Sequence, residues 1–101
     1  MNLGKTGSLT EDTAQEIAIG ALTFLGSEPE QLGRFLSLAG IGPQEIRDAA
    51  AEPGFLAGVL EFLMQDEQLL LAYTESVGVR PTMIAAAHLK LAGGVDFLAQ
   101  H

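Results

Sequence analysis

The sequence contains no cysteine and no tryptophan, and only five of its 101 residues are lysine or arginine. The lack of cysteine excludes a disulfide framework, a thiol nucleophile and a cysteine-ligated zinc or iron–sulfur site. Long apolar runs are also missing: the run from Leu69 to Tyr73 is far too short to span a bilayer, and no signal-peptide stretch follows Met1. We therefore expect a cytoplasmic protein without a membrane segment.

Acidic residues dominate the charge of the chain. Thirteen aspartates and glutamates against five basic residues give a formal net charge of −8. This charge repels nucleic-acid phosphates and anionic membranes, and its simplest role is to keep a chain that is 48% hydrophobic soluble. A basic partner would suit the charge, although no motif points to one.

The chain repeats itself at an offset of 38 residues. Residues 20–49 align without a gap on residues 58–87 and give nine identities, where about three are expected from such a composition. The identical pairs are Gly20/Gly58, Leu22/Leu60, Phe24/Phe62, Leu25/Leu63, Leu32/Leu70, Gly40/Gly78, Pro43/Pro81, Ile46/Ile84 and Ala49/Ala87. A period of this size is typical of a supersecondary unit that stacks on a second copy.

The spacing of apolar residues predicts an all-α fold. Apolar residues recur at intervals of three and four, and sustained alternation is missing. We expect residues 1–101 to form one six-helix domain with two tandem three-helix units, at about residues 14–52 and 53–92, after a flexible tail at residues 1–9.

Capping residues predict where the helices begin and end. The first helix should start near Thr10 or Thr13 and stop at Gly26, and the second should open with a capping box from Ser27 to Glu30. Left-handed glycine caps are expected at two equivalent positions, each followed by a proline that opens the next helix; the glycines are Gly40 and Gly78.

The helix at about residues 53–64 is apolar nearly all round, which favours either a central position or partial cover by another chain. Glycines inside helices cost stability, so the equivalent Gly20 and Gly58 predict a close crossing of the first and fourth helices. After the sixth helix, which should run from Thr82 to about Ala92, a short terminal segment is expected to dock through Val95, Phe97 and Leu98.

Seven short groups of residues along the chain resemble those of a known protein family. With these groups in this order and spacing, the chain resembles, over about residues 14–81, a family of short uncharacterised helical proteins common in alphaproteobacteria. The resemblance implies a bacterial cytoplasmic protein and brings no assigned activity, ligand or catalytic residue. The groups are Leu32-Gly33-Arg34-Phe35-Leu36, Gly40-Ile41-Gly42-Pro43, Arg47, Phe55-Leu56, Val59-Leu60, Phe62-Leu63 and Asp66-Glu67.

The turn Gly40-Ile41-Gly42 is a candidate anion-binding site. It resembles the hairpin of helix-hairpin-helix modules, whose backbone N–H groups bind a DNA phosphate, and it also fits helix-turn-helix spacing. The helix that follows carries three carboxylates against Arg47 alone, and Arg80 replaces the second glycine in the repeat. Such an acidic helix would repel phosphates, so a capped corner between helices is the simpler interpretation.

Residues with catalytic or metal-binding chemistry are sparse and scattered. His88 falls on an apolar helix face with no carboxylate within one turn, which is typical of a half-buried, hydrogen-bonded histidine. Glu30 and Arg34 lie four apart and predict a solvated ion pair. We therefore expect no catalytic residue, no metal and no cofactor.

The sequence favours a protein-interaction module, acting as a homo-oligomer or as an adaptor. The second unit carries more large apolar residues than its helix faces can bury, and we expect Phe62, Leu69 and Leu71 to contribute to a symmetric dimer interface. Nucleic-acid binding through the Gly40 turn is one alternative. Small-ligand binding between the two units is another.

Overall fold

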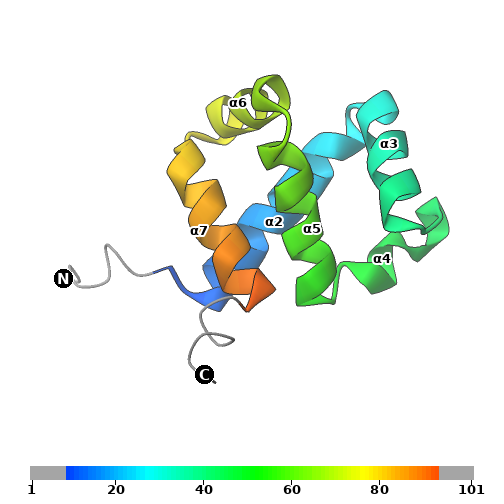
Figure 1. Ribbon diagram of the computed structural model, residues 1–101, viewed down its shortest axis with the longest axis horizontal. Coiled ribbons are helices and arrows are strands. Elements are labelled where there is room, and N and C mark those ends of the chain that lie inside the picture. The colour runs from blue at the N-terminus through cyan, green and yellow to red at the C-terminus, as the bar shows by residue number, and fades with distance from the viewer. Residues whose placement is uncertain (1–8, 94–101) are drawn as a thin grey trace.

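The computed structural model describes residues 9–93, which form six α-helices and one 3-10 turn and contain no strand (Figure 1). The predicted all-α fold is confirmed. The elements are α2 (Glu11–Gly26), α3 (Pro29–Ala39), η1 (Pro43–Glu45), α4 (Ile46–Ala49), α5 (Pro53–Met64), α6 (Glu67–Val77) and α7 (Pro81–Ala92). None of these helices is long and apolar enough to cross a bilayer.

Side-chain caps begin two of the helices. The Thr10 Oγ1 accepts a hydrogen bond from the Thr13 N–H at 3.1 Å, as expected for the start of α2. Asp66 caps α6 in the same way. The capping box predicted at Ser27 is wrong, because its hydroxyl instead donates to the Phe24 carbonyl at 2.7 Å and closes the end of α2.

The two predicted glycine caps are confirmed. Gly40 and Gly78 have φ of 75° and 74°, in the left-handed region that favours glycine. In the first cap, the N–H groups of Gly40 and Ile41 both donate to the Leu36 carbonyl, and the second cap repeats this pattern on the Thr74 carbonyl. Each cap therefore gives two backbone donors to one carbonyl in the last turn of the ending helix.

Helix α5 lies at the centre of the fold, as its apolar surface predicts. It packs against α2, α7, α6 and α3, and α7 also packs along α2 (Figure 1). This packing buries six side chains of α5: Leu56, Ala57, Val59, Leu60, Phe62 and Leu63. Burial of so many apolar side chains is the main source of stability in a fold of this kind.

The helix ends repeat at an offset of 38 residues, but the packing does not. Helix α7 is long enough to bury Ile84, Ala87 and Leu91 against α2 and α5, whereas the equivalent segment of the first unit is the short pair η1 and α4. Pro53 stands at the position equivalent to Leu91 and starts a new helix there. The duplication stays a prediction.

The close crossing predicted at Gly20 and Gly58 is wrong. A Cβ atom on Gly20 would lie 2.5 Å from the Tyr73 hydroxyl oxygen, which belongs to α6, and a Cβ atom on Gly58 would have nothing within 4 Å. The two glycines therefore face different surroundings. Residues 1–8 of the tail expected at residues 1–9 lie outside the described residues, and so does the docking segment expected at Val95, Phe97 and Leu98.

Candidate functional site

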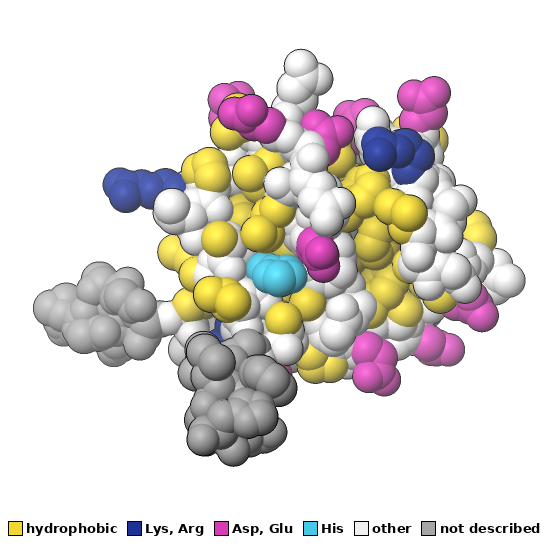
Figure 2. Space-filling model, viewed as in Figure 1, with side chains coloured by type: hydrophobic (Ala, Val, Ile, Leu, Met, Phe, Trp, Pro, Cys, Tyr) yellow, Lys and Arg dark blue, Asp and Glu magenta, His cyan; other side chains and the backbone are white. Residues whose placement is uncertain are grey.

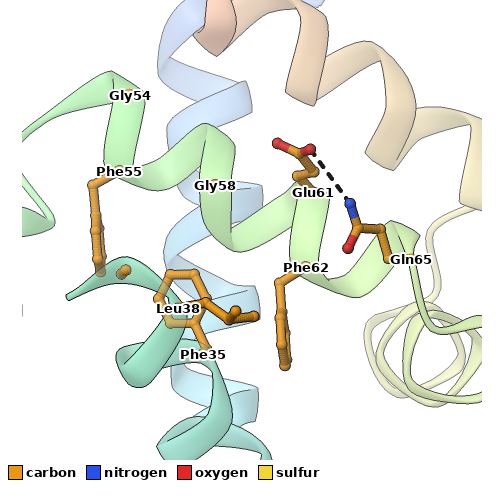
Figure 3. A pocket seen from close by; sticks show the side chains of 9 residues that line it. Phe35, Leu38, Gly54, Phe55, Gly58, Glu61, Phe62 and Gln65 are labelled. Atoms are coloured by element: carbon orange, nitrogen blue, oxygen red, sulfur yellow. Dashed lines mark hydrogen bonds between the residues drawn. The ribbon is translucent and has the colours of Figure 1, made fainter. Parts of the chain in front are cut away.

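An open, largely apolar groove of about 400 Å³ lies between α3 and α5. In Figure 3, Phe55 and Phe62 project from α5 toward α3, and Phe35 reaches toward them from α3. The residues that line the groove are Phe35, Leu38, Ala39, Gly54, Phe55, Gly58, Glu61, Phe62 and Gln65.

Two glycines of α5 form the floor of the groove, where the helix backbone is not covered by side chains. Gly54 and Gly58 are four residues apart and so lie on the same face of the helix. A Cβ atom on either would have nothing within 4 Å, so the space in front of both is open. Because a glycine inside a helix costs about 1 kcal/mol relative to alanine, Gly58 keeps this space open at the expense of stability.

Aromatic rings fix the walls of the groove. The Phe35 ring is 5.4 Å from the Phe55 ring and 5.5 Å from the Phe62 ring, in edge-to-face arrangements. The Arg34 guanidinium lies 5.3 Å from the Phe62 ring centroid and donates to the Gln31 Oε1 at 2.7 Å. Arg34 therefore does not form the predicted ion pair with Glu30.

Leu38 stands at the rim of the groove and is 74% exposed, more than any other large apolar side chain in residues 9–93. It projects from α3 beside Phe35 in Figure 3. The space-filling view in Figure 2 shows an apolar area on the right of the molecule, with both acidic and basic side chains near its edges. An exposed leucine next to an apolar groove is a common feature of interaction surfaces.

The polar end of the groove is built around Glu61. The Gln65 Nε2 donates to the Glu61 Oε2 at 3.4 Å, and the His88 Nε2 of α7 lies 3.8 Å from the Glu61 Oε1. The His88 side chain is 23% exposed and the Glu61 side chain is 57% exposed. Sequence spacing alone placed no carboxylate near His88, because Glu61 reaches it from a different helix.

This pair does not make a metal centre. In the part of the chain that the structure describes, no three histidine, aspartate or glutamate side chains come close enough to hold a metal ion. A single carboxylate beside a half-buried imidazole forms an ion pair when the imidazole is protonated. Glu61 thus gives the groove one negative group at its edge.

The sequence offset of 38 residues pairs this region with a second one, between α2 and α6, and there the space is filled. Tyr73 is equivalent to Phe35, and Gly20 is equivalent to Gly58. The Tyr73 hydroxyl lies against Gly20 and donates to the Ile17 carbonyl at 2.8 Å. Phe35 has no hydroxyl, and the space in front of Gly58 is left open.

The three residues expected at an interface lie in different surroundings. Phe62 and Leu69 are only 7% and 8% exposed, because they pack into the core of the same chain. Leu71 is 38% exposed and remains accessible. The predicted dimer interface stays a prediction, and of these three side chains Leu71 offers it the most surface.

The candidate anion-binding turn has no free backbone donor. The N–H groups of Gly40 and Ile41 both donate to the Leu36 carbonyl. The Gly42 N–H donates to the Glu45 Oε1 at 2.8 Å, so the chain's own carboxylate occupies the place where a phosphate would bind. The turn therefore serves as a capped corner between α3 and η1.

The groove was not identified from the sequence, although it lies between the two units, where a ligand site was one alternative. Sequence reasoning missed Leu38 and Gly54. The signal that could have found them is the pair of glycines four residues apart on α5, flanked by Phe55 and Phe62 on the same helix.

Comparison with known protein families identifies a family for this chain. The sequence model of the family described as "Protein of unknown function (DUF3572)" matches residues 11–94, which include every described helix. No curated protein and no solved structure matches the chain.

Proposed function

Because the chain belongs to this family of unknown function, we propose a role on the basis of its own surface: the protein is a small interaction module that binds an apolar helical segment of another protein between α3 and α5. The groove with its glycine-lined floor carries the proposal. We place this activity in the bacterial cytoplasm and assign no catalytic step to it.

The shape of the groove supports binding of a helix. Helix-in-groove recognition uses a preformed apolar channel that accepts side chains spaced three or four residues apart. Gly54 and Gly58 allow the partner's side chains to approach the α5 backbone closely. The Phe55 ring is partly exposed beside them, and the buried rings of Phe35 and Phe62, 5% and 7% exposed, support it from behind. Leu38 at the rim extends the apolar surface that a partner would cover.

The alternatives receive less support. Nucleic-acid binding through Gly40-Ile41-Gly42 would need donors that are already used within the chain, and the net charge of −8 repels phosphates. A small ligand is usually held in a site that buries most of its surface, whereas this groove is open along one side.

Site-specific photo-crosslinking tests the proposal. A photoreactive phenylalanine analogue is placed at Leu38, beside the groove, in cells that naturally make the protein. The control carries the same analogue at Leu89, which is 54% exposed on α7 and does not line the groove. We expect a discrete protein adduct from position 38 and none from position 89. Equal adducts from both positions, or none from position 38, would refute a binding role for the groove.

A further inference from the structure

The charge around the groove also indicates which kind of partner it binds. Resting on the proposed function, we infer that the partner segment is a cationic amphipathic helix, whose apolar stripe fills the groove and whose adjacent lysine or arginine meets Glu61. The partner therefore carries opposite charge to this chain, rather than being a second copy of it.

The segment that builds the groove is strongly acidic. Residues 28–66 supply both walls and contain seven carboxylates but only two arginines and no lysine. One of the two arginines, Arg34, donates to the neutral Gln31 side chain and lies over the Phe62 ring, so one positive charge remains beside the groove. The segment is still net acidic, with seven carboxylates against two arginines. A net negative field raises the local concentration of cationic partners and speeds their association.

Glu61 provides the specific contact. Among the residues that line the groove it is the one with a charged side chain, and that side chain is 57% exposed. Its neighbours Gln65 and His88 hold the carboxylate at the groove's edge without covering it. A partner ammonium or guanidinium group can therefore approach it and form a charge-assisted hydrogen bond.

The same charge argues against two other occupants. A second copy of the chain would bring together two molecules that each carry a net charge of −8, which opposes self-association through this face. An anionic membrane surface is repelled for the same reason. A cationic helix, by contrast, is attracted by the negative field that repels these two occupants.

Two designed peptides test this inference on the full-length protein. Both are helical and carry leucines at i, i+3, i+4 and i+7; one has lysines on the flanking positions and its twin has glutamates there. We expect the lysine peptide to bind at least about tenfold more tightly by isothermal titration calorimetry, with an affinity that falls as salt is added. Equal or weaker binding of the lysine peptide overturns the inference.

Variants locate the binding. Gly58→Leu places a side chain in the groove, and Leu38→Ser removes apolar surface from an exposed position, so both should weaken lysine-peptide binding in chains that circular dichroism shows to be folded. Glu61→Gln should weaken it by about two- to fivefold, the range of an exposed ion pair. The matched control Glu75→Gln removes a carboxylate from α6 and should leave the affinity unchanged.

The outcomes separate this inference from the function on which it rests. If the glutamate peptide binds instead, or if the protein dimerises, and Gly58→Leu abolishes that binding, the groove is an interaction surface but its partner is not cationic. If lysine-peptide binding is the same in wild-type protein, Gly58→Leu and Leu38→Ser, the peptide binds elsewhere and both the inference and the proposed use of the groove fail.

Discussion

The Tyr73 hydroxyl lies directly against Gly20, at a point where a Cβ atom would come within 2.5 Å of its oxygen. From there it donates to the Ile17 carbonyl at 2.8 Å, and its ring packs 5.5 Å from the Phe24 ring. This contact joins α6 to α2 across 56 residues of sequence. It also explains why a glycine stands in the middle of α2.

The first prediction tests this contact. Gly20→Ala should destabilise the protein by about 1 to 2 kcal/mol, because the added methyl displaces a buried hydroxyl and breaks its hydrogen bond, and this loss exceeds the gain of about 1 kcal/mol in helix propensity. Tyr73 is only 2% exposed, so its ring cannot swing out to avoid the methyl group. Urea unfolding monitored by circular dichroism measures the change.

A double-mutant cycle controls for other causes of the loss. In a Tyr73→Phe background the hydroxyl is absent, so Gly20→Ala should no longer destabilise and should instead stabilise by up to about 1 kcal/mol. If Gly20→Ala costs the same in both backgrounds, the methyl group clashes with something other than the hydroxyl.

The second prediction concerns pH. Burial raises the pKa of Tyr73 above its usual value of 10.0, because the charged tyrosinate is poorly solvated in the core. The unfolded chain therefore loses this proton at a lower pH than the folded chain does. The stabilisation is complete below pH 10.0 and is lost as pH rises through the raised pKa, so the free energy of unfolding should fall between these two pH values.

The composition makes this titration simple to observe. The chain has one tyrosine and no tryptophan, so the ultraviolet absorbance of tyrosinate reports Tyr73 alone. The folded protein should titrate at a higher pH than the urea-unfolded chain, and Tyr73→Phe should remove the signal. Superimposable titration curves for the folded and unfolded chains would show that the hydroxyl is not buried.

The third prediction uses the two glycine caps. Gly40→Ala and Gly78→Ala should each cost about 1 kcal/mol, and by equal amounts, because both positions have the same left-handed backbone and the same hydrogen bonds. Neither added methyl group meets another atom within 4 Å, so the cost is backbone strain alone. Thermal unfolding measures both variants.

Gly26→Ala is the matched control for the caps. Gly26 also has open space around it but is the last residue of α2 and does not have positive φ. Alanine there should be neutral or slightly stabilising. Cap variants as stable as this control would contradict the left-handed geometry.

The fourth prediction is that an alanine at Gly58 has the opposite effect on stability to an alanine at Gly20. Gly58→Ala should stabilise the protein by up to about 1 kcal/mol, because alanine is the better helix former and its methyl group enters open space. Gly33→Ala, at another helical glycine with nothing within 4 Å, should behave similarly. A destabilising Gly58→Ala, measured by urea unfolding, would mean that the groove is closed in solution.

Sequence reasoning succeeded where the physics is local. Thr10, Gly40 and Gly78 mark helix ends because each satisfies backbone groups within a few residues of itself. The apolar surface of α5 likewise predicted its central position, since nearly every face of that helix must be covered.

Contacts between distant segments were beyond local reasoning. A helical glycine can mark a close approach or an open groove, and only the tertiary structure shows that Gly20 is the first and Gly58 the second. In the same way, His88 meets Glu61 from another helix, and Arg34 turns to Phe62 instead of Glu30. Each of these depends on how helices pack, which spacing within one helix does not determine.

The most direct test of the groove combines crosslinking with stability. The photoreactive analogue at Leu38 is introduced into a Gly58→Leu chain and into an Ala72→Leu chain, which adds the same bulk at an exposed position of α6. Gly58→Leu places a side chain in the groove and should lose the adduct in a chain that urea unfolding shows to be folded, whereas Ala72→Leu should keep it. A stable Gly58→Leu chain that still forms the full adduct would show that the partner does not enter the groove.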